Sequence, residues 1–440
     1  HSSYSNRDQR LHIGEGYFFD VQPQAGFHRG VVQTVRSPLW FHHAYFSFRV
    51  PGKKITQSYT AGYRWMQQLL NSNLGINSAV FMPFANDSGN QISWRNSRFY
   101  TEAHYQLKLQ KLRADLRLPF WVQSIVSNQP FYQVAATKRV LLFLPQLDLT
   151  YNFDNEKYVR GGIAVQNNFG DVTTAFQGAI LLNYLTLQAF QQSLPQDRSY
   201  ESSVHYYHQK SINLLSYNLG FTFRQTEMNM VLSDSFANRI RRSFFVPLIN
   251  RQTSYGLQAG FSKYLFKVKT NIALKAQVRQ SLYIQFVNGQ QFDVQANNGS
   301  ASLTAIKKLG KAVELNYEAA TSLFLTKLYH AGEKTELGSS GFLIDQRARA
   351  TLQIFKRIFV ETTALHRSNK MTGLDNVGYF FWDAALRRQA LYKGLDVELH
   401  CRNLLNVQEY SILFQNVNQV TSSSYQLWGR TIFLGLNYSF

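Results

Sequence analysis

Residues Tyr425–Phe440 read YQLWGRTIFLGLNYSF and decide the fold. At every second position one face carries large apolar side chains: Trp428, Ile432, Leu434, Leu436, Tyr438 and Phe440. The other face is mostly small or polar, with Thr431, Gly435, Asn437 and Ser439, and Arg430 interrupts the apolar face. This alternation predicts a β-strand. From Trp428 to Tyr438 it spans about 33 Å at about 3.3 Å per residue. Tilted by about 40°, it matches the ~25 Å apolar band of an outer-membrane barrel.

The composition fits such strands and excludes a helical membrane protein. The chain has 440 residues and a mean hydropathy of −0.27, and no apolar run approaches the ~20 residues of a transmembrane helix. Aromatic residues make up 15% of it, and girdles at the two membrane interfaces are one place for them. The single cysteine, Cys401, excludes an internal disulfide and a thiolate metal cluster. We expect Cys401 to lie against lipid as a small hydrophobic residue.

The net positive charge limits the classes of partner that this protein is expected to bind. A formal net charge of +20 fits nucleic acid, an anionic substrate or phosphorylated lipid. Because the positive charge is dispersed rather than gathered in a stripe, we expect no nucleic-acid partner. Outer-membrane lipid and lipopolysaccharide remain, and the loop residues Arg239, Arg241 and Arg242 have the chemistry to pair with phosphate. A solvated loop is the simpler interpretation of these three arginines.

The connections between predicted strands alternate in length. Counting back from the C-terminus, the long ones are 403–424, 367–377, 327–340 and 287–299, and the short ones between them are 391–393, 355–357 and 308–311. Long extracellular loops and short periplasmic turns are typical of a bacterial outer-membrane barrel, and this order places the C-terminus on the periplasmic side. Within the long gap 166–199, the stretch GAILLNYLTLQAF fits either a short helix or a buried strand.

The fold class predicted is all-β: a transmembrane antiparallel up-and-down β-barrel. We expect residues 1–27 to form an extracellular loop segment and residues 28–440 to form the barrel, with about 18–20 strands. Our count is 19, whereas closed bacterial barrels have an even number of strands and no open edge in lipid. We therefore expect further strands upstream of His1.

Charged residues at alternate positions predict a polar ladder that faces the barrel lumen. Its expected members are Glu314, Glu318, Asp345, Arg347, Arg349, Asp383, Arg387, Asp396, Glu398 and His400. The estimated hairpin register places Arg387 near Asp396, Asp383 near His400, and Glu318 near Arg349. Such pairs are structural rather than catalytic.

A catalytic alternative rests on Asp396, Glu398 and His400, which share one face. A ladder is the better interpretation, because acid–base chemistry also needs an activated nucleophile or water within reach. The pairs His42–His43 and His205 with His208 lack the spacing and the carboxylate of a zinc site. We expect no enzyme activity, no metal and no cofactor.

Two motifs near the C-terminus resemble a known family. Asn403-Leu404-Leu405-Asn406, a long loop and then Trp428-Gly429-Arg430 are similar to the end of a TonB-dependent outer-membrane receptor. The middle, LDLTYNFDNEKY followed by NNFGDVTTAFQGAILLNYLTLQAFQQSLPQ, resembles Bacteroidetes-type members that carry a carboxypeptidase-regulatory-like domain at the N-terminus. The resemblance covers most of residues 140–440.

The resemblance implies a 22-stranded barrel of which this chain is part, located in the outer membrane, with a plug domain that is not visible in this sequence. It implies energy-coupled import of a nutrient. The implied partners are the TonB complex, reached through a plug not present in this chain, a surface lipoprotein, and assembly machinery that reads the C-terminal strand. Trp428, Tyr438 and Phe440 are the expected membrane-girdle and C-terminal signal residues. The alternative is a plugless passive pore or a structural barrel of a secretion complex.

Overall fold

The computed structural model describes residues 2–5, 8–13, 16–17, 27–28, 31–76, 82–83, 89–183, 186–190, 194–237, 240–310, 312–392, 394–415 and 420–438. Nearly all of them lie in β-strands, and most strands belong to one sheet of 26 strands. The described residues contain no helix that is both long and apolar enough to cross a membrane.

The wall of the sheet is an up-and-down succession in which each pass pairs antiparallel with the next. In the described residues eighteen passes are formed by β1 (Ser2–Ser5) with β2 (Asp8–Ile13), β5 (Val31–Arg36) with β6 (Leu39–Val50), β7 (Ile55–Ile76), β9 (Gly89–Lys108), β10 (Leu112–Gln129), β11 (Val134–Phe143) with β12 (Gln146–Asn152), β13 (Lys157–Phe169), β16 (Gln196–Lys210), β17 (Leu215–Met228), β20 (Asn250–Leu265), β21 (Thr270–Val287), β22 (Gln290–Leu309), β23 (Val313–His330), β24 (Glu333–Phe355), β25 (Ile358–Met371), β26 (Val377–Tyr392), β27 (Leu395–Arg402) and β30 (Thr431–Tyr438).

Shorter elements lie in the connections. They are β3 (Gly16–Tyr17), β4 (Phe27–His28), β8 (Met82–Pro83), the 3-10 helix η1 (Pro130–Tyr132), β14 (Ile180–Asn183), β15 (Thr186–Phe190), β18 (Val231–Ala237), β19 (Ile240–Val246), the 3-10 helix η2 (Phe266–Val268), β28 (Glu409–Gln415) and β29 (Val420–Gln426). The hairpins β3–β4 and β28–β29 form two small separate sheets.

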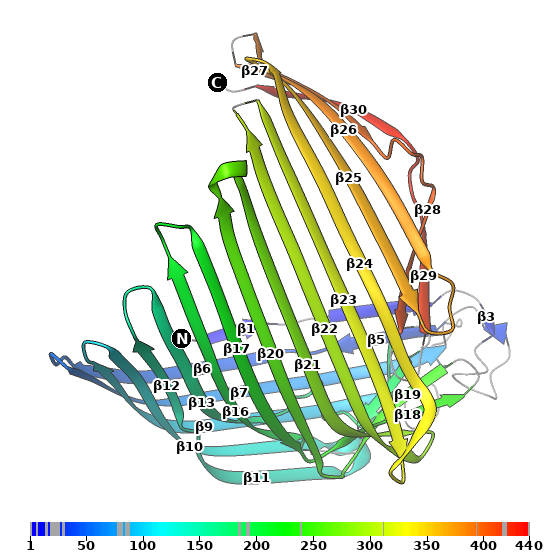
Figure 1. Cartoon of the computed structure of the whole chain (residues 1–440). Coiled ribbons are helices and arrows are strands. Elements are labelled where there is room, and N and C mark those ends of the chain that lie inside the picture. The colour runs from blue at the N-terminus through cyan, green and yellow to red at the C-terminus, as the bar shows by residue number, and fades with distance from the viewer. Residues whose placement is uncertain are drawn as a thin grey trace.

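The wall is strongly curved (Figure 1). Strands β20 to β26 run diagonally across the front of the view, whereas β6, β7, β9 and β13 run almost horizontally below and behind them. Within the described residues no pairing joins β30 to β1 or β2. The wall therefore has two edges, β30 at one side and β1 with β2 at the other.

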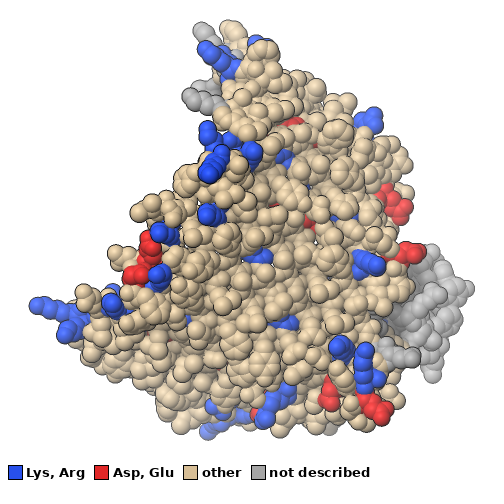
Figure 2. Space-filling view, viewed as in Figure 1, with Lys and Arg blue, Asp and Glu red and all other residues tan. Residues whose placement is uncertain are grey.

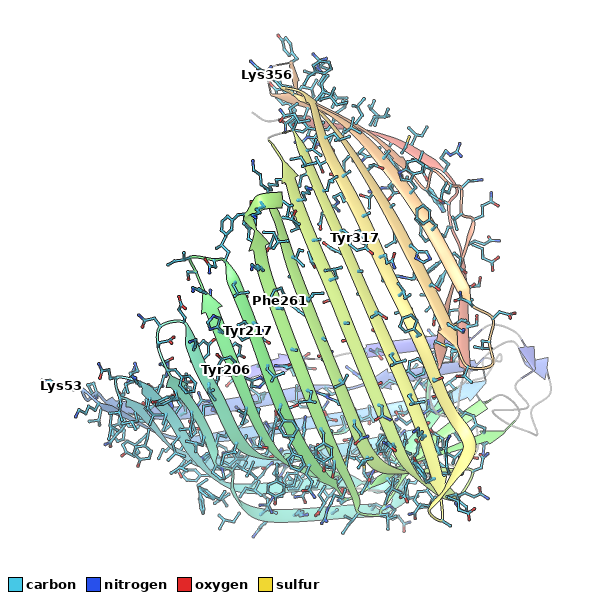
Figure 3. The ribbon with its side chains drawn as sticks, viewed as in Figure 1. Lys53, Tyr206, Tyr217, Phe261, Tyr317 and Lys356 are labelled. Carbon is cyan, nitrogen blue, oxygen red and sulfur yellow. The ribbon has the colours of Figure 1, made fainter. Side chains whose placement is uncertain are left out.

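The outer face of the wall is apolar and exposed. Leu219, Leu257, Val278 and Leu323 are more than half exposed on it, and Lys and Arg gather at the strand ends around a largely uncharged belt (Figure 2). Aromatic side chains of β16, β17, β20 and β23 follow one diagonal line that rises from the side of Lys53 toward the side of Lys356 (Figure 3): Tyr206, Tyr217, Phe261 and Tyr317. An apolar belt with an aromatic row at its border is the lipid-facing surface of an outer-membrane β-barrel.

Residues 1–27 differ from the expected extracellular loop. β1 pairs with β6 from Ser2↔His42, and β2 pairs with β5 from Asp8↔Arg36, so both are wall strands. The polar composition of Ser2–Ile13 concealed them, because this edge strand carries no alternating apolar face. Residues 18–26 lie outside the described part of the chain.

Two expected long loops are two-residue turns. β21 and β22 meet at Asn288–Gly289, and β23 and β24 meet at Ala331–Gly332; all four residues have positive φ, between 49° and 83°. Positive φ at both central residues fits the twist of a hairpin, which continues the strands to their tips. The expected loops at 287–299 and 327–340 are therefore wrong, whereas the expected loop 403–424 lies within a long connection between β27 and β30, residues 403–430.

The long gap 166–199 folds back onto the inner face of the wall, the face opposite the apolar belt. Its ambiguous stretch forms the hairpin β14–β15, not a helix. β15 pairs in parallel with β19, β19 pairs with β18, and β18 pairs in parallel with β21 at Ser233↔Phe286. This cross-sheet, β14–β15–β19–β18, joins the hairpin to the distant wall strand β21.

The main apolar core lies under this hairpin. Trp94 and Ile125 from the inner face of β9 and β10 are completely buried, and they pack with Val172, Phe176 and Phe190 from the folded-back segment. Three buried amide side chains of the wall bond to the backbone of the same segment: Gln33 to Leu181, Asn90 to Gly178, and Gln129 to Ala175. The segment is therefore fixed to the wall by apolar packing and by paired backbone groups.

Candidate functional site

The inner face of β24 to β27 carries most of the predicted polar ladder. Because side chains alternate across a strand, the odd positions of β24, β25 and β26 share this face with the even positions of β27. Arg347 and Arg349 on β24 thus line the same hollow as Glu398 and His400 on β27, which are about 50 residues away in the sequence.

The first part of the ladder joins β24 to β25. Asp345 lies directly opposite Arg367, whose Nε donates to Oδ2 at 2.9 Å. A second nitrogen of Arg367 donates to the Tyr410 hydroxyl at 2.5 Å. Four residues further along β24, Arg349 lies 3.5 Å from Glu361.

The second part joins β26 to β27 and is centred on Arg387. Its guanidinium lies 2.9 Å from Asp396 and 3.0 Å from Glu398. The other oxygen of Glu398 lies 3.1 Å from Nε2 of His400. The expected contact between Arg387 and Asp396 is therefore present, with Glu398 directly opposite Arg387 and Asp396 diagonal to it.

Two expected pairs are displaced by two residues in register. Asp383 accepts a hydrogen bond from the backbone N–H of Asn403 at 2.7 Å, and His400 instead contacts Glu398. Glu318 faces Arg347 across the strands and accepts a hydrogen bond from Asn316 at 3.1 Å. Glu314 lies 3.3 Å from Lys308. A two-residue shift keeps every side chain on its face, so the alternation alone cannot fix it.

Three members of the ladder were not predicted from the sequence: Glu361, Arg367 and Tyr410. Glu361 and Arg367 are six residues apart on β25, an even spacing that places them on one face. Tyr410 belongs to the separate hairpin β28–β29, and no strand pattern announces its contact with Arg367.

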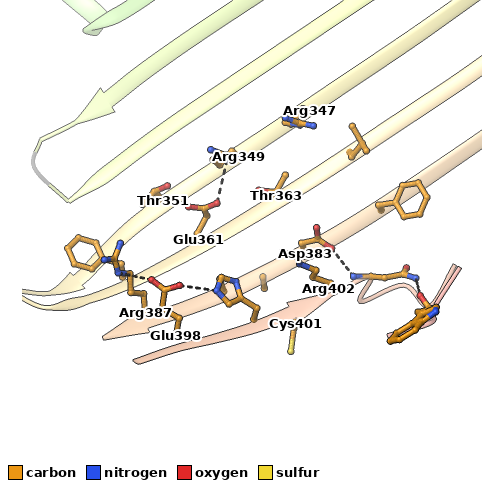
Figure 4. Close-up of a pocket in the computed structure, with 18 of the residues that line it drawn as sticks. Arg347, Arg349, Thr351, Glu361, Thr363, Asp383, Arg387, Glu398, Cys401 and Arg402 are labelled. Atoms are coloured by element: carbon orange, nitrogen blue, oxygen red, sulfur yellow. Dashed lines mark hydrogen bonds and ion pairs between the residues drawn. The ribbon is translucent and has the colours of Figure 1, made fainter. Parts of the chain in front are cut away.

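A hollow of about 980 Å³ lies over this ladder. Figure 4 shows Arg387 and Glu398 on the same side of their strands and Cys401 directed away from them. Phe359, Phe381, Tyr410 and Trp428 add aromatic surface to a lining that also carries charged and polar side chains. The site can therefore offer both charge and aromatic contact to a polar solute.

The carboxylates on which the catalytic alternative rests take part in the ladder. Arg387 and His400 bind Glu398 from opposite sides, and Arg387 also binds Asp396, so both carboxylates serve the ladder. Within the described residues no group of three or more His, Cys, Asp or Glu side chains is placed to hold a metal.

The C-terminal motifs form a clasp at the loop end of β27 and β30. Asn403-Leu404-Leu405-Asn406 is a tight turn in which both asparagines have positive φ. The Asn406 side chain accepts a hydrogen bond from the Arg430 N–H at 3.0 Å, and the Arg430 guanidinium donates to the Leu404 carbonyl at 3.0 and 2.7 Å.

The clasp interrupts the C-terminal stretch. Leu427–Arg430 belongs to no strand, so β29 and β30 are separate and the expected unbroken strand is wrong. Trp428 lies in this break and is 83% exposed, and Tyr438 lies at the far end of β30 and is 57% exposed. Phe440 lies outside the described residues.

The loop arginines differ from one another. Arg241 donates two hydrogen bonds of 2.9 Å to the buried Asp234, which is held also by Ser243 and Gln285. Arg241 thus joins β19 to β18 within the cross-sheet, and its guanidinium is occupied by the ion pair with Asp234. Arg242 is on the neighbouring position of β19, and Arg239 lies outside the described residues.

The sequence matches no model of a known protein family, and no curated protein matches it. The solved structures that it matches include the following three. The copper transporter OprC has 10% sequence identity and a TM-score of 0.44, over 100% of this chain and 79% of that one. The ferric-catecholate import receptor Fiu from E. coli K12 has 12% identity and a TM-score of 0.32, over 99% and 80%. The outer membrane transporter YddB from Escherichia coli has 10% identity and a TM-score of 0.31, over 94% and 76%.

Proposed function

We propose that this chain is the barrel wall of a TonB-dependent outer-membrane receptor that imports a nutrient by energy coupling. The observation that carries the proposal is the inner face. It bears a ladder of ion pairs beside a hollow of about 980 Å³, while the outer face is apolar. A wall with a wet, charged interior suits passage of a polar solute. The NLLN and WGR motifs, which form one clasp here, are the elements that resemble this family.

The remaining parts of the receptor belong to the same proposal. An unpaired strand edge is not tolerated in lipid, so further strands would cover the edges at β30 and at β1 with β2. A plug would occupy the lumen and contact TonB. A Bacteroidetes-type receptor with a carboxypeptidase-regulatory-like N-terminal domain and a surface lipoprotein is the finer form of this proposal.

Dependence on energy separates this function from the alternative, a passive pore. Solute depletion from the medium would be compared among the wild-type strain, a strain lacking this gene and a strain lacking TonB. A receptor predicts at least one solute whose depletion is lost in both deletion strains and is abolished by a protonophore. Depletion that requires this gene but continues without TonB and with the protonophore would show a passive pore instead.

A further inference from the structure

A second row of inner-face side chains, far from the polar ladder, has an uncompensated positive charge. Across β6, β7, β9 and β10 the directly opposed residues are His43, Arg64, Arg98 and Gln123. Arg64 and Arg98 are therefore cross-strand neighbours. Like charges in this position destabilise a sheet, so the pair needs an explanation.

The surrounding strands supply no counter-charge. β6 and β7 contain no Asp or Glu, β9 contains only Glu102, and β10 contains only Asp115. Glu102 is four residues from Arg98, about 13 Å along the strand. Asp115 is already bound by Arg113 at 3.0 Å and by His104 at 3.2 Å. In the described part of the chain no carboxylate lies within salt-bridge distance of Arg64 or Arg98.

Both guanidinium groups are nevertheless held in place by aromatic rings. Arg98 lies over the Trp121 ring at 3.8 Å, and Arg64 lies over the Phe41 ring at 5.6 Å. Stacking on an aromatic face leaves the edge of a guanidinium, with its N–H donors, available to a ligand. Arg98 is half-buried, and its Nε atom is buried without a hydrogen-bond partner.

The side chains next to Arg64 and Arg98 are also held in fixed positions by their neighbours. Gly62 leaves space for Tyr100, since a Cβ on Gly62 would lie 2.7 Å from that ring. The Tyr100 hydroxyl lies 2.9 Å from Nε2 of His43, and His43 stacks on Tyr45 at 5.2 Å. Gln123, buried across from Arg98, is fixed by a 2.9 Å hydrogen bond to Asn96 and has a free carbonyl oxygen. That oxygen carries no charge, and among the described residues neither it nor the Nε of Arg98 has a hydrogen-bond partner.

We propose that Arg64 and Arg98 form a binding site for a small oxyanion, a carboxylate or phosphate group, on the inner wall. Oxyanions accept paired N–H bonds from guanidinium groups, and one anion between the two arginines removes their repulsion. Elsewhere on the inner face Arg349, Arg367 and Arg387 have carboxylates of this chain as partners. At Arg64 and Arg98 the bound oxyanion supplies the negative charge that a carboxylate of the chain supplies to those three arginines. The site goes beyond the proposed import function and does not depend on energy coupling.

The test measures thermal unfolding of the full chain in detergent at constant ionic strength, with chloride, inorganic phosphate or succinate as the anion. We expect phosphate, succinate or both to raise the unfolding temperature above its value in chloride. An effect of phosphate alone identifies a phosphate ligand, and an effect of succinate alone identifies a carboxylate. Equal unfolding temperatures in the three salts would overturn the proposal.

Variants locate the effect. Arg64→Gln and Arg98→Gln should each weaken the apparent anion affinity about tenfold, whereas Arg113→Gln, at an arginine that has its own carboxylate, should leave it unchanged. In chloride, Arg98→Gln should be at least as stable as the wild type, because it removes the repulsion. A purely structural Arg98 predicts the reverse, a less stable variant whose response to anions is unaltered, and that result would refute the site.

Discussion

The guanidinium of Arg430 donates two hydrogen bonds to the backbone carbonyl of Leu404, at 3.0 and 2.7 Å. These bonds join the residue before β30 to the turn after β27, so the 403–430 connection is closed at its base. Arg430 interrupts an apolar alternation in the sequence because it is a clasp residue and not a strand residue. Its role is visible only when the two motifs are seen together.

Arg430→Ala should loosen this connection without unfolding the wall. Arg430 is exposed, so we expect its removal to reduce the stability of the connection by about 1 kcal/mol, the net contribution of an ordinary hydrogen bond. Limited proteolysis should cut the 403–430 connection faster, while the barrel keeps its heat-modifiable mobility on gels. Lys356→Ala, at the tip of a turn on the opposite end, is the matched control and should behave as wild type. Equal cleavage of the two variants would contradict the clasp.

Gly429→Ala should have an effect of the same sign. A Cβ on Gly429 would lie 2.4 Å from the Asn406 side-chain oxygen that accepts the Arg430 N–H. Asn406 must then move and release this bond. Gly435→Ala provides the comparison, because its Cβ would meet Glu398 only at 3.7 Å. The same proteolysis assay should separate the two variants, and if Gly435→Ala proves the more sensitive, the clasp geometry is wrong.

Leu434→Arg tests which face of β30 meets lipid. Leu434 is 67% exposed on the apolar face, whereas Asn437 lies opposite Asp396 on the inner face. A charged side chain on the lipid face costs about 2–4 kcal/mol at the bilayer midplane, and a lumen substitution is tolerated. Urea unfolding in lipid vesicles should therefore show a large loss for Leu434→Arg and little change for Asn437→Arg. Similar losses would mean that the faces are assigned the wrong way round.

A double-mutant cycle of Arg387→Gln and Glu398→Gln measures the interaction energy between these two residues of the ladder. Arg387 is nearly half exposed, and pairs of this kind contribute about 0.2–1 kcal/mol. We expect a coupling energy in that range that falls as salt concentration rises. A cycle between Arg387 and Glu314, which pairs with Lys308 on another strand, should show no coupling. Salt-independent coupling would argue against an ion pair.

Gln33→Leu should free the folded-back segment from the wall. Gln33 is buried and bonds to both the N–H and the C=O of Leu181, at 2.7 and 2.9 Å. Each backbone group left unpaired costs about 1–3 kcal/mol. Hydrogen exchange at Leu181 should accelerate, and it should not do so in Gln209→Leu, at an exposed position near a turn. Unchanged exchange in Gln33→Leu would show that apolar packing alone holds the segment.

The membrane wall could be predicted from the sequence because its two faces have different solvents. Lipid outside and water inside impose strict alternation, which identified the apolar face of Leu434 and Leu436 and the polar face of Arg387 and Glu398. The register between strands was harder to predict, since a shift by two residues leaves the alternation intact. The estimated register therefore placed Asp383 near His400, whereas His400 lies opposite Ala385.

Strand segments beyond the lipid could not be predicted in the same way. The outer face of Gln290–Ala296 carries Gln291, Asp293 and Gln295, and Glu333–Leu337 is mostly polar, so both resembled loops although they are hairpin tips. The stretch Ile180–Phe190 was ambiguous for another reason. Its apolar residues face Trp94 and Ile125, which are distant in sequence, and periodicity within the stretch does not identify them. The arginine pair Arg64–Arg98 was missed because cross-strand neighbours depend on register.

The cross-sheet β14–β15–β19–β18 has a consequence for the order of folding. Most wall strands pair with a neighbour in the sequence, and such hairpins form early because their loops are short. The parallel contacts of β15 with β19 and of β18 with β21 join segments about 50 residues apart and require both partners to be in position first. The cross-sheet should therefore assemble last, as a slow kinetic phase that follows formation of the wall.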